Sequence, residues 1–378
     1  MRVVYDENMP AVADYLGHCC ELTAVNGRRL DPAQLRGVDA LLVRSVTAVN
    51  ADLLADSSLR FVGSATSGVD HVDRALLEAR GIAFRHAPGA NANSVVEYVL
   101  GAIAAIDVTL EQLLAGARLG IVGYGHVGRK LAARCEALGI DWCATDPWLP
   151  DGSIPRPASL EEVLRCEVIS LHPELTRSEP WPSYHLLGEQ SLDDLHGRQL
   201  LINASRGPVL DNTALLRRLS GSDAPTVVLD VWEHEPRVDA GLLRHARLGT
   251  AHIAGYSLDA KINATQQLAE SLRQLFDLPG PGDTPGELDP SVLRLNASSP
   301  AGAVRSLLGQ RYRIEDDDQR LRAVVLSGSA PASGFDLLRK NYPERREVAG
   351  SPVQVAASAG SLARWAEALG AVPVEVGG

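Results

Sequence analysis

Apolar residues near the start of the chain recur in short runs that alternate with segments of helical spacing. Runs typical of buried strands lie at 2–5, 40–43, 60–62 and 81–84. Helix-like segments accompany them at 10–20, 32–37, 51–56 and 72–79. Because parallel strands need helical crossovers, this alternation predicts a small parallel α/β domain. Polar loops follow two of the strands, at 44–47 and 64–68, where open α/β sheets bind ligands, although ordinary turn chemistry explains either loop alone.

The next part of the chain repeats the alternation on a larger scale. A nearly all-apolar helical segment at 93–106 predicts a helix that is buried between two domains. Further runs typical of buried strands lie at 119–122, 140–145, 168–171, 199–203, 226–230 and 249–253. A helical pattern at 258–275 follows, and we expect it to return the chain to the first domain.

The stretch from 279 to 300 is rich in proline, glycine and serine, which makes it the best linker candidate. Beyond it we expect a basic helical segment at 335–347, a strand at 353–356, a helix at 362–369 and a strand at 372–376. We interpret the acidic run at 315–318 as a solvated turn. The sequence thus predicts three domains, at 1–93 with 258–280, at 94–257 and at 281–378.

The strand run at 119–122 leads into a G-x-G-x-x-G loop that is formed by Gly123, Gly125 and Gly128. In a dinucleotide-binding unit the first glycine permits a tight turn and the second lets the pyrophosphate approach the backbone. The third glycine lets the following helix pack closely on the strand. We expect the amides of His126 and Val127 at the N-terminus of that helix, where unpaired N–H groups favour an anion.

A helical segment at 129–138 and a second strand follow the loop, and Asp146 ends that strand. A carboxylate at this place accepts hydrogen bonds from the ribose of NAD and repels the extra phosphate of NADP. A lone G-x-G-x-x-G pattern is weak evidence, because a plain glycine-rich turn has the same letters. With a strand before it, a helix after it and an acid at the next strand end, the segment predicts a βαβ unit for NAD.

Composition excludes several functional classes. The net charge of −11 and the pI of about 5.4 argue against a general nucleic-acid surface. No stretch approaches the roughly 20 apolar residues that a membrane helix needs, and no signal-peptide core follows the N-terminus. The five cysteines lack metal-ligand spacing, so we expect no metal site. These features predict a cytoplasmic protein that binds neither nucleic acid nor a membrane.

Three polar residues, Arg206, Glu235 and His252, each follow a strand run of the nucleotide-binding sheet. Oxidation of an alcohol by NAD needs a base, and imidazole titrates near neutral pH. A carboxylate bonded to the far ring nitrogen orients such a base, and a guanidinium suits a substrate carboxylate. Taken singly, each residue has an equally good structural interpretation. Arg206 could be a surface residue, Glu235 an acid at the start of a helix, and His252 a hydrogen-bonded histidine of the core. Together, after a dinucleotide-binding motif, the three residues predict an acid/base site.

Three segments around these residues resemble signatures of the NAD-dependent D-2-hydroxyacid dehydrogenases: NASRG at 203–207, DVWEHEP at 230–236 and HIAGY at 252–256. Further segments resemble a branch of that family that has an additional C-terminal domain and acts on 4-phospho-D-erythronate in vitamin B6 biosynthesis. These are DENMP at 6–10, LVRSVT at 42–47, GVDHVD at 68–73, VEYV at 96–99, LRK at 338–340 and RRE at 345–347. The similarity extends from residue 1 to about residue 370.

The resemblance implies a Rossmann-type NAD domain, a flavodoxin-like substrate-binding domain and a small C-terminal α+β domain that forms a homodimer. It implies that His252 is the acid/base, that Glu235 is its partner and that Arg206 anchors the substrate. Substrate contacts are implied for Ser45, Thr66 and Tyr256. Cofactor contacts are implied, besides the glycine loop, for Asp146, Ser205, Arg206, Gly207, Asp230 and Gly255. The family has His-Thr-Pro-Leu where this chain has His172-Pro173-Glu174-Leu175, so Pro173 takes the place of a threonine that contacts NAD.

Two alternatives to this function stay open at this point. One is the same chemistry on another 2-hydroxy acid such as 3-phosphoglycerate. The other is a non-catalytic NAD(H)-sensing corepressor, because such proteins share the fold and the three polar residues.

A cluster of basic residues, Arg339, Lys340, Arg345 and Arg346, also has two interpretations. It is either a solvated helix face, offset by neighbouring glutamates, or a source of contacts to the substrate phosphate.

Overall fold

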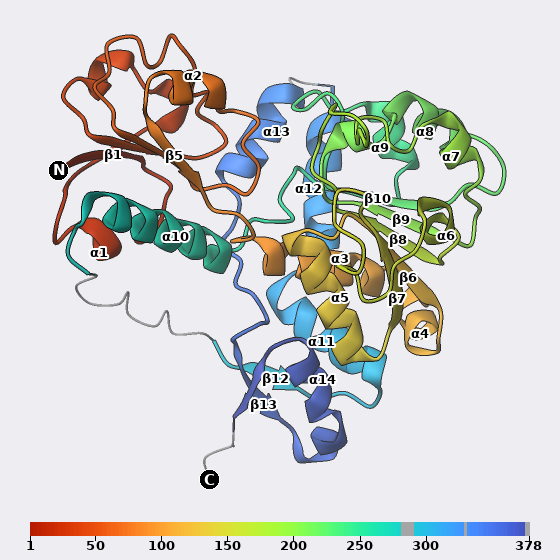
Figure 1. The fold of residues 1–378 in the computed structure, drawn as a ribbon. Coiled ribbons are helices and arrows are strands. Elements are labelled where there is room, and N and C mark those ends of the chain that lie inside the picture. Colours follow the sequence, from red (N-terminus) through yellow and green to blue (C-terminus); the bar gives the residue numbers. More distant parts are fainter. Residues whose placement is uncertain (281–290, 329–330, 375–378) are drawn as a thin grey trace. The chain divides into compact units, whose positions relative to one another are not determined.

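The computed structural model describes residues 1–280, 291–328 and 331–374 and divides them into two compact units. The first unit contains residues 1–91 and 256–280, and the second contains residues 92–255 and the described residues from 291 onward. Within the described residues the named strands form three sheets, and the strand pairs in them are parallel (Figure 1). The α/β class expected from the alternating pattern is confirmed.

The first unit is a five-stranded sheet with the order β2-β1-β3-β4-β5, which is the flavodoxin-like order that was expected. Its strands are β1 (Arg2–Asp6), β2 (Glu21–Val25), β3 (Ala40–Val43), β4 (Phe61–Ser64) and β5 (Ala83–His86). Its helices are α1 (Val12–Leu16), α2 (Arg74–Ala79) and α10 (Leu258–Phe276), with 3-10 turns at Gly27–Arg29 and Pro32–Leu35. Apolar side chains of α10, including Leu268 and Leu272, pack against Phe61, so the expected return of the chain at 258–275 is confirmed.

The second unit contains a six-stranded sheet with the order β11-β10-β9-β8-β6-β7. Its strands are β6 (Arg118–Val122), β7 (Asp141–Thr145), β8 (Val168–Leu171), β9 (Leu200–Asn203), β10 (Thr226–Leu229) and β11 (Leu248–Gly249). One face packs against α6 (Leu160–Leu164), α7 (Glu189–Asp193), α8 (Asn212–Leu219) and α9 (Ala240–His245). The buried helix α3 (Ala92–Ala105) packs against the partly exposed helix α5 (His126–Leu138) in the same unit, with α4 (Thr109–Leu114) beside α3.

The register of this sheet brings its strand ends into one row. Val122 of β6 lies opposite Leu171 of β8, which lies opposite Asn203 of β9. Asn203 in turn lies opposite Leu229 of β10, and Leu229 lies opposite Gly249 of β11. The loops that follow these strands therefore all begin at the same edge. The chain order reverses at β6, and such a switch point is where α/β sheets bind nucleotides.

The C-terminal part of the second unit contains a three-stranded sheet, β12 (Leu293–Leu295), β13 (Pro352–Val355) and β14 (Val372–Val374). Its helices are α11 (Pro300–Arg311), α12 (Ile314–Val325), α13 (Pro331–Lys340) and α14 (Ala363–Ala368), with a 3-10 turn at Ala357–Leu362. Leu321 and Val325 of α12 and Phe335 of α13 are buried in the core of the nucleotide-binding sheet. Residues 281–290 of the expected linker and 375–376 of the expected last strand lie outside the described residues.

Several expected elements differ in the structure. Residues 51–56 form turns instead of a helix, because so short a segment gains too few hydrogen bonds to nucleate one. β2 was not expected, because this edge strand is mostly exposed and its sequence lacks an apolar run. Beyond Gly249 the expected strand becomes a loop. The basic helical segment ends at Lys340, shortly before Pro343, whose ring cannot continue a helix.

The acidic run at 315–318 is the first turn of α12 and not a solvated turn. Carboxylates are favoured at this end of a helix by the macrodipole. Asp317 and Asp318 are buried, and the Oδ1 atom of Asp318 accepts a hydrogen bond from the N–H of Gly249 at 2.7 Å. The run therefore attaches α12 to the edge strand β11.

Candidate active site

The glycine loop lies at the carboxyl end of β6 and begins α5. Gly123 has φ +90°, and a Cβ on it would lie 2.6 Å from the carbonyl carbon of His172. A Cβ on Gly128 would lie 2.1 Å from the carbonyl oxygen of Gly123, whereas a Cβ on Gly125 would meet no atom within 4 Å. Gly125 is the N-cap of α5, so its open side lies next to the amides of His126 and Val127. This arrangement fits a pyrophosphate, which binds at the N-terminus of a helix.

Asp146 lies beside this loop, at the end of β7. Its Oδ2 atom accepts a hydrogen bond from the N–H of Tyr124 at 2.8 Å, and its Oδ1 atom accepts one from the N–H of Trp148 at 3.1 Å. Each carboxylate oxygen can accept a second hydrogen bond. The side chain is therefore oriented by the loop itself, and it keeps the capacity to bind a ribose hydroxyl.

The residues after β8 complete this side of the edge. The backbone of His172 and Pro173 packs so closely against Gly123 that no Cβ fits there. Nε2 of His172 lies 2.8 Å from Oγ of Ser170. Burial of the ring lowers the pKa of His172 to about 3. His172 is therefore neutral near pH 7. Glu174 is exposed, and Pro173 offers no side-chain hydroxyl for a cofactor.

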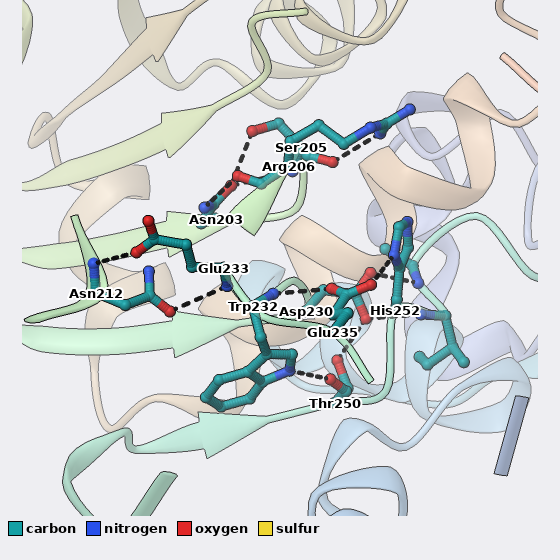
Figure 2. A network of polar contacts seen from close by, with 12 residues as sticks. Asn203, Ser205, Arg206, Asn212, Asp230, Trp232, Glu233, Glu235, Thr250 and His252 are labelled. Carbon is teal, nitrogen blue, oxygen red and sulfur yellow. Dashed lines mark hydrogen bonds and ion pairs between the residues drawn. The ribbon is translucent and has the colours of Figure 1, made fainter. Parts of the chain in front are cut away.

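Asn203 fixes the turn that presents Arg206. Its Oδ1 atom accepts hydrogen bonds from the N–H and the hydroxyl of Ser205, at 3.1 and 2.8 Å, and its Nδ2 atom donates to the carbonyl of Arg206 at 3.0 Å. A Cβ on Gly207 would lie 2.0 Å from the backbone of Trp232, so only glycine fits there. The half-buried side chain of Arg206 leaves this turn and donates to the carbonyl of Ser205 at 2.8 Å (Figure 2).

The loops after β10 and β11 bring Glu235 and His252 together (Figure 2). Nδ1 of His252 lies 2.7 Å from Oε2 of Glu235, and the other oxygen of Glu235 accepts a hydrogen bond from the N–H of Trp232 at 2.8 Å. Burial alone raises the pKa of Glu235, but His252, the Trp232 amide and the charge of Arg339 together lower it below its ordinary value. The carboxylate is thus ionised near neutral pH and oriented toward the ring.

Asp230, at the start of the loop after β10, holds the backbone around His252. Its carboxylate is 1% exposed and accepts hydrogen bonds from Ile253 N–H at 2.7 Å, Ala254 N–H at 2.9 Å and Thr250 Oγ1 at 2.6 Å. His252 itself has φ +55°, which is uncommon for a residue with a side chain. The contact between Asp230 and NAD stays a prediction, and in the structure this carboxylate orients the histidine loop.

The remaining substrate residues lie in the first unit. Ser45 follows β3 and Thr66 follows β4, and these strands are neighbours in one parallel sheet. Ser45 is exposed, and Thr66 Oγ1 donates to the carbonyl of Gly68 at 2.6 Å. The ring of Tyr256 lies 5.6 Å from Nζ of Lys261. Their contacts with a substrate stay predictions.

Sequence reasoning missed the support behind the histidine loop. The hydroxyl of Tyr98 lies 2.9 Å from Oγ1 of Thr250, and Nε1 of Trp232 donates to the carbonyl of Thr250 at 2.9 Å. A usable signal was present, because the polar residues at 93, 94, 97 and 98 of an otherwise apolar helix have the spacing of one helical face.

The interpretation of the basic cluster as a solvated helix face is wrong for Arg345, whereas Lys340 is exposed at the end of α13. Arg345 and Glu347 are each 6% exposed, and residues 341–347 are not helical. Nη2 of Arg345 donates to the carbonyl of Ala254 at 2.7 Å, so this guanidinium is used inside the second unit. Arg339 is the member of the cluster whose charge acts on Glu235.

One group of potential metal ligands occurs among the described residues, formed by His185, Asp211 and Glu233. Nε2 of His185 lies 2.6 Å from Oε1 of Glu233, and the other oxygen of Glu233 accepts a hydrogen bond from Asn212 N–H at 3.1 Å. These bonds attach the loop that carries Glu235 to His185 and to the N-terminus of α8, and we assign no metal to the group.

Family models match two parts of the chain. Residues 99–254 match the NAD-binding domain of the D-isomer specific 2-hydroxyacid dehydrogenases, and residues 289–370 match a domain of unknown function. The chain is also 42% identical to the erythronate-4-phosphate dehydrogenase of Cellvibrio japonicus, over 98% of this chain and 99% of that one. The chain belongs to the erythronate-4-phosphate dehydrogenase family. A second member of this family, from Escherichia coli K12, is 41% identical over 92% of each chain.

Solved structures of other 2-hydroxyacid dehydrogenases have the same fold. The NAD-bound 3-phosphoglycerate dehydrogenase of Entamoeba histolytica has a TM-score of 0.63 at 20% identity, over 73% of this chain and 95% of that chain. The D-lactate dehydrogenase of Aquifex aeolicus, in complex with NAD and lactic acid, has a TM-score of 0.59 at 20% identity, over 73% and 96%. Among the described residues, none of the helices is long and apolar enough to cross a membrane.

Proposed function

We propose that this protein oxidises 4-phospho-D-erythronate to (R)-3-hydroxy-2-oxo-4-phosphooxybutanoate with NAD, as a step of vitamin B6 biosynthesis. The names of relatives that are about 40% identical over nearly the whole chain support the substrate. The observation that carries the chemistry is the His252–Glu235 pair, which lies at the carboxyl edge of a sheet whose glycine loop fits a dinucleotide.

NAD, when bound, accepts the hydride that leaves C2 of the substrate. His252 takes the proton of the C2 hydroxyl through Nε2, because Nδ1 is bonded to Glu235. The ionised carboxylate of Glu235 stabilises the imidazolium that forms. The electron pair of the broken O–H bond becomes the second bond of the C2 carbonyl group, while the electron pair of the C2–H bond leaves with the hydride. The products are therefore a 2-oxo acid, NADH and a proton, which His252 releases to solvent.

Arg206 supplies the positive charge of the proposed site. Its planar guanidinium suits the C1 carboxylate and the oxygen that becomes a carbonyl. Asn203 and Gly207 fix the turn that carries it, so the position of the Arg206 backbone is set before the substrate binds. Ser45, Thr66 and Tyr256 complete the proposed substrate contacts.

The test is an assay of NADH absorbance with 4-phospho-D-erythronate and with 3-phosphoglycerate, in both single-turnover and steady-state conditions. We expect NADH from the first acid and at most trace formation from the second. Single-turnover conditions ensure that slow NADH release does not hide the chemistry. NADH formation from 3-phosphoglycerate alone would assign the other substrate, and NADH binding without any oxidation would indicate a sensor of NAD(H).

We further propose that the chain forms a homodimer through residues 281–378. Val292, Leu326, Leu337 and Val372 are large apolar side chains of this part that are exposed in the single chain. A second copy that covers these side chains would remove their apolar surface from water, which favours association. Light scattering after gel filtration measures the mass directly, and a monomer at micromolar concentration would refute the proposal.

We propose a cytoplasmic location for the enzyme. The cysteines at 19, 20, 135, 143 and 166 are free thiols, and Sγ of Cys143 lies 3.6 Å from Sγ of Cys166 without a bond. Two thiols that lie so near each other stay unbonded in a reducing compartment. Cell fractionation with an antibody against the protein tests the location.

A further inference from the structure

The carbonyl oxygen of Ala254, two residues after His252, accepts hydrogen bonds from two distant side chains. Ser94 of α3 donates through Oγ at 2.8 Å, and Arg345 of the C-terminal segment donates through Nη2 at 2.7 Å. The same Nη2 atom also donates to Ser94 Oγ. The three groups form a closed triangle inside the second unit.

The opposite side of the same loop is held by Asp230, which accepts hydrogen bonds from the amides of Ile253 and Ala254. The loop is thus held through its N–H groups on one side and through the Ala254 carbonyl on the other. A trans peptide is planar, so its C=O and N–H groups point in opposite directions. The direction of the Ala254 carbonyl therefore sets the direction of the Gly255 N–H, the predicted cofactor contact.

Arg345 is held firmly enough to fix this peptide. Its side chain is 6% exposed, and its guanidinium lies 4.3 Å from the centre of the Tyr312 ring. The backbone that follows is attached to α3, because Glu97 accepts hydrogen bonds from the amides of Val348 and Ala349, each at 2.9 Å. A buried guanidinium that lies over an aromatic ring presents its planar set of N–H groups in a fixed direction.

We propose that Arg345 and Ser94 are positioning residues, which orient the Ala254–Gly255 peptide and through it both His252 and the bound cofactor. The C-terminal segment then affects catalysis through the backbone of the histidine loop, without touching the substrate. The turnover part of this proposal rests on the proposed function, whereas its cofactor part does not.

The alternative is that Arg345 only attaches the C-terminal segment to α3. Arg305 provides a matched control, because its Nε atom donates to the carbonyl of Ala104, near the other end of α3, at 2.9 Å. Its guanidinium also pairs with Glu111. Arg305→Met therefore removes a comparable link between the C-terminal segment and α3, at a place that carries no residue of the site.

The test compares Ser94→Ala, Arg345→Lys, Arg345→Met and Arg305→Met in the full-length protein. For Arg345→Met we expect kcat to fall by about 10- to 100-fold, since small displacements of catalytic groups have effects of this size. The KM of the hydroxy acid stays within about twofold, because Arg206 is untouched, whereas the Kd of NADH, measured by fluorescence, rises several-fold. Ser94→Ala gives a smaller effect in the same direction, and Arg345→Lys recovers part of the loss.

Arg305→Met lowers Tm and leaves kcat and the Kd of NADH at the wild-type values. Wild-type kcat and NADH affinity in both Ser94→Ala and Arg345→Met would overturn the proposal. A loss of activity in Arg305→Met as large as that in Arg345→Met would also overturn it.

Two measures keep the test decisive. Arg345→Met removes one of the positive charges near the buried carboxylate of Glu97. The double variant Arg345→Met/Glu97→Gln is therefore made as well, to separate loss of folding from loss of positioning. If the wild-type protein does not oxidise 4-phospho-D-erythronate, the proposed function fails, but the Kd of NADH still reports on the Ala254–Gly255 peptide.

Discussion

His252 and Glu235 meet through Nδ1 and Oε2 at 2.7 Å, although they belong to the loops after two different strands. Those strands, β11 and β10, are parallel neighbours whose last residues, Gly249 and Leu229, lie opposite each other in the sheet. The pairing is therefore a consequence of the register. It leaves Nε2 of the ring as the nitrogen that exchanges a proton with the substrate.

We expect His252→Asn to remove most turnover, because the amide cannot take the hydroxyl proton. Loss of general base catalysis costs about 10²- to 10⁴-fold in kcat. The affinity for NADH should stay close to that of the wild type, since no cofactor contact is assigned to the ring. Near-normal turnover of this variant would show that the base has been misassigned.

Glu235→Gln should move the pH–rate profile of kcat toward lower pH. The carboxylate stabilises the imidazolium form of His252, and the neutral amide does not. The pKa of Glu235 lies below its ordinary value, so the charge that the variant removes is present throughout the working range. The profile is measured between about pH 5 and pH 9, and an unshifted profile contradicts the electrostatic role.

The sequence predicted the dinucleotide unit well, because its signal is local. The strand before Gly123, the helix after it and the strand that Asp146 ends lie within one βαβ unit. Each of these elements has its own pattern of apolar residues. The pairing of Glu235 with His252 was also predictable, because the carboxyl ends of parallel strands lie at one edge.

The support of the site was not predictable, because it depends on contacts between distant parts of the chain. Arg345 and Ser94 are separated by 251 positions, and a basic residue in a polar stretch gives no sign of burial. Asp318 looked solvated for the same reason, since its partner, the N–H of Gly249, is a backbone group that no side-chain pattern reveals.

Asp146→Asn should narrow the preference for NAD over NADP. The asparagine keeps an oxygen for the Tyr124 N–H and thus the shape of the glycine loop, but it loses the negative charge. A hydrogen bond to a charged group is worth about 1.5–3 kcal/mol, so the ratio of kcat/KM for the two cofactors should change by about 10- to 100-fold. Asp146→Ala is the harsher comparison, because it also removes the bond to the loop. Equal use of NAD and NADP by the wild-type protein would contradict the role of Asp146.

The last prediction concerns the pH dependence of stability, and it rests on Glu97 in α3. Burial, with the neighbouring charge of Glu347, raises the pKa of Glu97 from 4.5 to about 7, although the amides of Val348 and Ala349 and the charge of Arg345 oppose the shift. The folded protein therefore binds a proton at this site between about pH 4.5 and pH 7, where the unfolded chain has lost it. The contribution of Glu97 to the free energy of unfolding is largest below this range and falls as pH rises through it. A shift of this size corresponds to about 3 kcal/mol.

Glu97→Gln removes this titration and keeps an oxygen for one of the two amides, which bind different oxygens of the carboxylate. We expect the Tm of the wild type to fall relative to the Tm of the variant as pH rises from about 5 to about 8, since only the wild type must ionise a buried carboxylate. Glu347→Gln should weaken the same pH dependence, because it removes the like charge beside Glu97. Parallel curves of Tm against pH for the wild type and Glu97→Gln would mean that Glu97 has the same pKa in the folded and unfolded chain.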